Sequence, residues 1–212
     1  METLKLLSQG ICQTVLITVT AFAIGAVAGL PLALLRRSRW RVISWSATMV
    51  IETVRAIPPI VVLFLLYYAV GSGAVKLSTF EAAVGGLGLI ASAYLAEVYR
   101  AGINAVHVGQ WEATRALGLP VLKTYSKVIL PQSLIVVIPP AATFAIGLLK
   151  DSAIASVIGV QDITFRAFQE TQATLQGLTI FGIAGLLYIA LSVPIAVVAR
   201  WTDHRLSRRV VL

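Results

Sequence analysis

The strongest constraint on this chain is Ile11–Leu35, a run of 25 consecutive residues without a charge. At about 1.5 Å per residue, a helix of this length exceeds the roughly 30 Å hydrocarbon core of a bilayer. The composition agrees, because 58% of the residues are hydrophobic and only 12% are charged. A soluble globular domain is therefore excluded, and the run predicts a membrane-spanning helix.

Further apolar stretches predict a bundle of such helices. Three more are uncharged and long enough to cross the membrane: Ala56–Val75, Val128–Leu149 and Thr171–Ala199. A fifth starts at Ala82 and reaches about Ala105 if Glu97 and Arg100 face protein rather than lipid. We predict an all-α polytopic membrane protein with one domain over residues 1–212. Its five spans are expected at about 10–35, 50–75, 82–105, 128–149 and 175–200.

The basic residues predict the orientation of the bundle. They gather after the first span, between the third and fourth, and after the fifth: Arg36, Arg37, Arg39, Arg41, Arg115, Lys123, Lys127, Arg200, Arg205, Arg208 and Arg209. With five spans, these three clusters lie on one side, and positive charge marks the cytoplasmic face. We expect the N-terminus outside and the C-terminus in the cytoplasm. The net charge of +8 then reflects topology and a membrane-lipid surface, not a nucleic-acid site.

Small residues predict close packing between the spans. Gly25 and Gly29 are four residues apart in the first span, and Gly182 and Gly185 lie in the fifth. Such positions let helix backbones approach, which suits a packed bundle better than a wide permanent pore.

Two pairs of charged residues lie near expected span ends. Glu52 and Arg55, and likewise Glu97 and Arg100, are three residues apart and can pair on one helical face. Pro58, the first residue of a proline pair, is expected to bend or locally unwind the second span. Glu52 and Arg55 equally fit a simple charged helix start with a harmless kink. Structural pairing is the main expectation for Glu97 and Arg100, with a gating contribution as a secondary one.

A third polar group follows the fourth span. The group consists of Lys150, Asp151 and Ser152, and Ser152 begins an uncharged stretch of ten residues, which is too short to cross and predicts a re-entrant or outer-face segment. A neighbouring cation and anion can bind the two charges of a zwitterion. The alternative is that both are solvated charges at the interface.

Several kinds of chemistry have no motif in this chain. The phosphate-binding loop of many ATPases requires Gly-x4-Gly-Lys-Ser/Thr, which does not occur. No Ser/His/Asp set converges, and the two histidines have no metal-ligand companions, so we expect no catalytic residue, no metal and no bound cofactor. A single cysteine, Cys12, excludes an internal disulfide.

Residues 109–131 form a polar, basic island between apolar runs, with the sequence GQWEATRALGLPVLKTYSKVILP. This island resembles the EAA loop of ABC importer permeases, the element that docks on the ATPase. The resemblance to the permeases of polar amino-acid ABC importers, of the histidine/glutamine type, extends over nearly the full chain. It is carried by five ordered segments: GICQTVLITVTAF, ETVRAIPPIVVLFLLYY, SAYLAEVYRAGINAVHVGQWEATRALGL, VILPQSL and LLKDSAIASVIGVQDIT. Thr114 and Val128 depart conservatively from the usual alanine and isoleucine.

The resemblance implies the ABC importer type I permease fold and a cytoplasmic coupling loop at about 106–127. Two short helices, at 109–119 and 120–127, would be joined by a sharp turn at Gly118. The implied coupling residues are Gly109, Glu112, Ala113, Thr114, Arg115, Ala116, Gly118 and Pro131. Lys150, Asp151 and Ser152 would lie near a substrate cavity, with Ala153, Ile154 and Val157 as lining.

The resemblance also implies partners and a location. An ABC ATPase dimer would bind ATP and Mg, an extracytoplasmic solute-binding protein would deliver the substrate, and a second copy or a paralogous permease would complete the pathway. The expected substrate is a polar amino acid or a related small zwitterion, and the expected location is the bacterial cytoplasmic (inner) membrane. Two alternatives are a self-sufficient channel or ion-coupled carrier, and a scaffold that anchors an ATPase without transporting.

Overall fold

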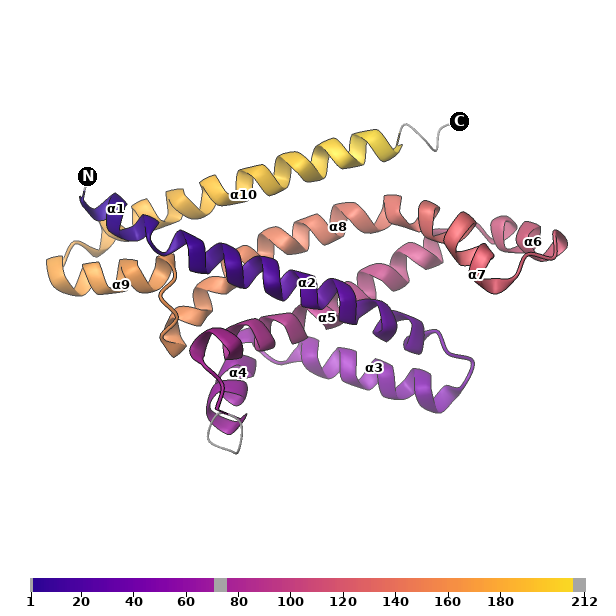
Figure 1. Cartoon of the computed structure of the whole chain (residues 1–212), viewed down its shortest axis with the longest axis horizontal. Helices are drawn as coiled ribbons and strands as arrows, with labels where there is room; N and C mark the ends of the chain where they lie inside the picture. Colours follow the sequence, from indigo (N-terminus) through magenta and orange to yellow (C-terminus); the bar gives the residue numbers. More distant parts are fainter. Residues whose placement is uncertain (1, 71–75, 208–212) are drawn as a thin grey trace.

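The computed structural model describes residues 2–70 and 76–207, and this part of the chain consists of helices and the turns between them (Figure 1). The first half contains α1 (Glu2–Ser8), α2 (Ile11–Arg36), α3 (Arg41–Ala56), α4 (Pro59–Phe64), a π-helical segment (Leu65–Val70) and α5 (Thr79–Ala105). The second half contains α6 (Val108–Ala116), α7 (Val121–Lys123), a second π-helical segment (Thr124–Ile129), α8 (Leu130–Asp151), a 3-10 helix (Ser152–Ile158), α9 (Ile163–Thr174) and α10 (Gly177–Ser207).

Four helical stretches are long and apolar enough to cross a membrane: Thr3–Arg36, Thr79–Ala105, Val121–Ile158 and Gly177–Thr202. A fifth crossing results if α3 and the helical stretch after it count as one bent span. The structure therefore confirms an all-α fold with several apolar spans.

The bend between α3 and α4 measures 102°. α3 ends at Ala56, and both Ile57 (ψ 130°) and Pro58 (ψ 137°) have extended backbones. A residue before proline is driven out of the helical region by contact with the proline ring, and proline itself has no amide hydrogen to donate. Pro59 can nevertheless start α4, because the first residue of a helix needs no amide partner. The described part of the span expected at 50–75 is therefore divided between two helices at a steep angle, and residues 71–75 lie outside the described residues.

α5 is the central helix of the bundle. It packs most extensively against α2 and also contacts α3, α4 and α8. A β-carbon built on Gly25 of α2 would lie only 2.4 Å from Cβ of Ala91 of α5, so the two backbones approach closely because glycine is present. Ile17, Leu63 and Leu87, all fully buried, form the core around this contact.

The two ends of the bundle carry different elements (Figure 1). α6, α7, the α2–α3 turn and the C-terminal part of α10 lie toward one end, called here the α6 end. α1, α9 and the start of α10 lie toward the opposite end, called here the α9 end. The two sets of predicted site residues fall on different ends, since the 109–131 segment belongs to the first and the segment after Lys150 leads to the second.

Candidate functional site: the coupling segment and the polar cavities

The segment from His107 to Lys123 folds into two short helices joined by a tight turn. His107 caps α6 through Nδ1, which accepts a hydrogen bond from the amide of Gly109 at 3.1 Å. At the other end of α6 the amide of Leu119 donates to the carbonyl of Thr114 at 3.0 Å, and Gly118 adopts φ +62°. This pattern is a Schellman turn, whose left-handed residue is usually glycine. A β-carbon at Gly118 would meet nothing within 4 Å, so the requirement comes from the backbone conformation and not from lack of space.

The predicted coupling residues differ in how far they are exposed. Thr114 is buried, with 3% of its surface exposed, and its hydroxyl donates to the carbonyl of Trp111 at 2.9 Å. Gly109 is half-buried. The remaining six are exposed: Glu112, Ala113, Arg115, Ala116, Gly118 and Pro131.

Sequence reasoning missed the apolar part of this surface. Leu117 and Leu122 are 75% and 80% exposed, and Val108 and Val121 are exposed as well. We call these four residues the coupling patch. Large exposed apolar side chains that gather in one patch favour a contact with another protein. The signal available in the sequence was the position of Leu117, Val121 and Leu122 inside an otherwise polar island.

A small cluster fixes this segment to the bundle. The rings of Trp111 and Tyr125 meet edge to face at 5.4 Å, next to the buried Ile103 and Ile129. The guanidinium of Arg37 lies 5.9 Å from the centre of the Trp111 ring, within the range of a cation–π contact. Arg37 also donates to the side chain of Asn104, so α6 is connected to the ends of both α2 and α5.

The two charged pairs form one network. Arg55 and Glu52 approach to 3.4 Å in α3, and Arg100 and Glu97 approach to 2.8 Å in α5. Arg36, at the end of α2, pairs with Glu52 at 3.2 Å and also with Glu97. Helices α2, α3 and α5 are therefore tied together at the α6 end.

The residues of the predicted substrate cavity are dispersed. Lys150 and Ala153 line a cavity of about 620 Å³ between α8 and α10, together with Tyr188 and Ser192. Val157 lines a different cavity of about 470 Å³ beside three phenylalanines.

The other predicted residues of this group have different surroundings. Ser152 is fully buried, and its hydroxyl donates to the carbonyl of Leu149 at 2.8 Å. Ile154 packs against the main core. Asp151 is half-buried, and no ion pair joins it or Lys150 to another side chain within residues 2–70 and 76–207.

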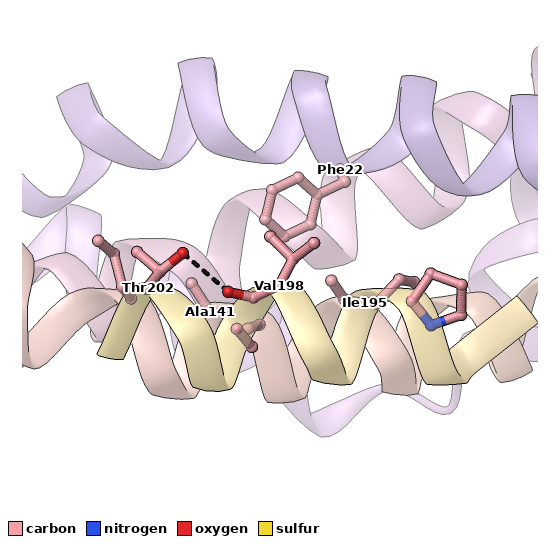
Figure 2. A pocket seen from close by; sticks show the side chains of 10 residues that line it. Phe22, Ala141, Ile195, Val198 and Thr202 are labelled. Atoms are coloured by element: carbon pink, nitrogen blue, oxygen red, sulfur yellow. Dashed lines mark hydrogen bonds between the residues drawn. The ribbon is translucent and has the colours of Figure 1, made fainter. Parts of the chain in front are cut away.

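A further cavity of about 490 Å³ lies between α2, α8 and α10 and is almost entirely apolar (Figure 2). Phe22 points toward Ile195 and Val198 of α10. The hydroxyl of Thr202 is occupied, because it donates to the carbonyl of Val198 at 2.8 Å. This cavity offers no free charged or amide group to a zwitterion.

Asp162 is a buried carboxylate that the sequence argument did not single out. It caps α9 by accepting from the amide of Phe165 at 2.7 Å, and the hydroxyl of Tyr188 donates to it at 3.3 Å. Next to it, the hydroxyl of Thr14 accepts from the amide of Ile163 at 3.3 Å. Burial raises the pKa of Asp162 to about 7. Asp162 thus connects α9 with α10, and its neighbour Ile163 connects α9 with α2.

The family follows from the sequence as a whole. The model of the family described as "Binding-protein-dependent transport system inner membrane component" matches residues 21–210. The chain belongs to this family. As an inner membrane component of this kind, it is a transport subunit, and its apolar helices are those of a multi-pass membrane protein.

Relatives of this inner membrane component are named as amino-acid permeases. The L-cystine transport system permease protein TcyB of Bacillus subtilis (strain 168) is 36% identical over 207 residues, which cover 97% of this chain and 88% of the relative. The arginine transport system permease protein ArtQ of the same strain is 34% identical over 94% of this chain and 91% of its own length. A crystal structure of an amino acid ABC transporter with histidines superposes with a TM-score of 0.87 at 33% identity, covering 95% of this chain and 94% of that one. The fold is that of an ABC importer permease.

Proposed function

We propose that this chain is the permease subunit of an ATP-driven importer of polar amino acids, coupled to a separate ATPase through residues 109–131. Family membership supports the assignment as a permease subunit. The exposed coupling patch is the observation that supports docking of the ATPase on this segment. Leu117, Val121 and Leu122 flank the turn at Gly118, Val108 is exposed at the start of α6, and Glu112 and Arg115 are exposed on the same helix. This arrangement fits insertion of the turn into a groove of the ATPase, with ion pairs around it.

The contacts behind the coupling patch support transmission of movement. ATP-driven closure of an ATPase dimer would displace α6, and Trp111 would pass this displacement to Arg37 and Tyr125. Arg36, next to Arg37, joins α2 to the carboxylates of α3 and α5. We propose that these helices move together between inward-open and outward-open states.

We propose Lys150 as the substrate-facing charge, with Asp151 beside it. Lys150 lines a cavity of suitable size, and its ammonium can bind the carboxylate of an amino acid. The hydroxyls of Tyr188 and Ser192 share this lining but already donate within the chain, to Asp162 at 3.3 Å and to the carbonyl of Tyr188 at 2.8 Å. The relatives named for cystine and arginine support an amino-acid substrate for this chain. Lys150→Gln is expected to raise the half-saturating substrate concentration for uptake, whereas Lys76→Gln is expected to leave it unchanged. Equal values for both variants would remove Lys150 from the site.

We propose that the α6 end is cytoplasmic and that a second copy or a paralogous permease completes the pathway. Basic residues gather at the α6 end, as expected for a cytoplasmic face. The apolar span of α10 is only 11% buried within this chain, which leaves a large surface for a partner or for lipid. An extracytoplasmic binding protein would deliver substrate at the α9 end, in a bacterial cytoplasmic membrane.

The test is uptake into vesicles of defined composition. Vesicles with this chain, its permease partner, the ATPase and the binding protein are expected to accumulate labelled amino acid only when ATP and Mg are present on the ATPase side. Vesicles with this chain alone are expected to show no flux. Substrate flux through the chain alone would instead establish the channel or carrier function, and ATPase binding without uptake would establish a scaffold.

A further inference from the structure

A polar cavity of about 310 Å³ lies at the α9 end, separate from the cavity of Lys150. It is enclosed by the α1–α2 junction, the start of α5 and the segment that leads into α9. Its main lining residues are Gln9, Cys12, Gln13, Phe80, Gln161 and Arg166. The substrate cavity proposed above has a single lysine among mostly apolar residues, whereas this one combines an arginine with three amides.

Arg166 is the cation of this cavity and lacks an acidic partner. Its Nη2 donates to the amide oxygen of Gln161 at 2.7 Å, which is a neutral acceptor. No carboxylate forms an ion pair with it within the described ranges 2–70 and 76–207, and no Asp or Glu lines the cavity. A carboxylate that enters the cavity therefore meets an uncompensated positive charge and no negative one.

Two buried polar atoms of the lining residues have no hydrogen-bond partner in the part of the chain that the structure describes. One is a donor, Nε of Arg166, and the other is an acceptor, Oε1 of Gln13. Buried polar atoms are normally paired, and unpaired ones require an explanation such as a bound molecule. Both atoms are covered in this state, so the side chains must turn toward the cavity to reach a ligand. Turning Arg166 costs its Nη2 hydrogen bond to Gln161, which a bound carboxylate replaces with a charge-assisted one.

A free amino acid has the complementary groups. Its carboxylate accepts from the arginine, and its ammonium donates to the amide oxygen of a glutamine. The volume also fits, because pockets for small molecules begin at roughly 300 Å³. We propose that this cavity is a second amino-acid site, in which Arg166 binds the carboxylate and Gln13 binds the ammonium. The choice of an amino acid as ligand rests on the proposed transport function.

Cys12 provides a reporter for this site. It is exposed, it lines the cavity, and it is the single cysteine of the chain. The purified complex in nanodiscs is treated with a maleimide, without binding protein, and labelling of this chain is followed by intact mass. The common L-amino acids and L-cystine are added one at a time, and the matching amines without a carboxylate serve as comparison.

At least one amino acid is expected to protect Cys12, and its carboxylate-free amine is not. At about ten times the dissociation constant, labelling should slow about tenfold, because only the empty site reacts. Arg166→Gln is expected to abolish the protection, while Lys5→Gln, which removes an exposed cation outside the cavity lining, should keep it. Gln13→Leu tests the proposed contact with the ammonium while the arginine is retained. The melting temperature of each variant shows whether it is folded.

Three results would overturn the inference. The first is no protection by any amino acid, and the second is protection that persists in folded Arg166→Gln. The third comes from a separate sample to which the binding protein is added: protection there and in no other sample would make the cavity a docking surface. Uptake by the same complex is measured in parallel. Uptake without protection rejects this site but leaves the transport function standing, whereas a wild-type complex without uptake rejects the transport function itself.

Discussion

Gly118 holds the turn of the coupling segment in a conformation that other residues adopt at a cost. Its φ of +62° is left-handed, and an L-residue there loses about 1–2 kcal/mol. We predict that Gly118→Ala weakens the turn by about this amount and reduces substrate-stimulated ATPase activity of the assembled complex. Gly147→Ala is the matched control, because its β-carbon also meets nothing within 4 Å and Gly147 lies within α8. Equal activity of the two variants would contradict the role of the turn.

Asp162 predicts a pH dependence of stability. Its pKa is raised to about 7 in the folded protein, against about 3.9 in an unfolded chain, so the folded state binds the proton more tightly. The resulting stabilisation is complete below the unfolded value and is lost as pH rises through about 7. We expect the melting temperature of the wild-type chain to fall between about pH 5 and pH 8, and that of Asp162→Asn to change less. The groups around the carboxyl are Tyr188, Thr14 and Thr164. A melting temperature that falls more steeply with pH in Asp162→Asn than in the wild-type chain would contradict the assignment.

Single-residue roles were predictable where they depend on local spacing. The pairs Glu52–Arg55 and Glu97–Arg100 follow from a separation of three residues on a helix. The role of Arg36 could not be predicted in this way, because Arg36 is 16 and 61 residues away from the carboxylates that it joins. The inward position of Thr114 was equally hidden, since it depends on how α6 lies against the bundle.

Among the helices, the connection of α2 to α3 and α5 depends on Arg36. Its side chain and that of Glu97 are 18% and 17% exposed, so removing one partner leaves a charge that water only partly solvates. We predict that Arg36→Gln lowers the free energy of unfolding by about 1–3 kcal/mol, between the values for exposed and buried pairs. Arg39→Gln, a nearby change at an exposed arginine whose guanidinium lies over the Trp40 ring, is the control. Chemical denaturation in mild detergent compares them, and equal losses would argue against the network.

The contact of α2 with α5 depends on the absence of a side chain at Gly25. A β-carbon there would lie 2.4 Å from that of Ala91, and overpacking costs about 1–3 kcal/mol or more. We predict that Gly25→Ala lowers the melting temperature of the purified chain, while Gly182→Ala, which has open space around it, does not. A stable Gly25→Ala would mean that the two helices are further apart than described.

Helix type was easier to predict than helix boundaries. Long uncharged runs predicted apolar helices because lipid requires a backbone that satisfies its own hydrogen bonds. The start of α3 at Arg41 was not expected, because the uncharged run begins only at Ala56 and the span was therefore predicted to start at about residue 50. The structure places Glu52 and Arg55 within the ionic network, so they do not mark where the helix begins.

For the molecule as a whole, the two ends of the bundle have separate roles in the proposed mechanism. The α6 end carries the coupling patch and the ionic network, and the α9 end carries Asp162 and the polar cavity of Arg166. The long helices α2, α5, α8 and α10 run between them. What covers the exposed face of α10 was beyond prediction from this sequence, because the covering atoms belong to lipid or to another chain.

The central claim is that residues 109–131 dock a separate ATPase, and co-purification from native membranes tests it most directly. The wild-type chain should be recovered with an ABC ATPase pair and a second permease subunit, counted by mass spectrometry. The double variant Leu117→Glu/Leu122→Glu should keep the permease partner and lose the ATPase, because both side chains belong to the coupling patch and are more than two-thirds exposed. Recovery of the wild-type chain alone, folded and stable, or full retention of the ATPase by the double variant, would contradict the account.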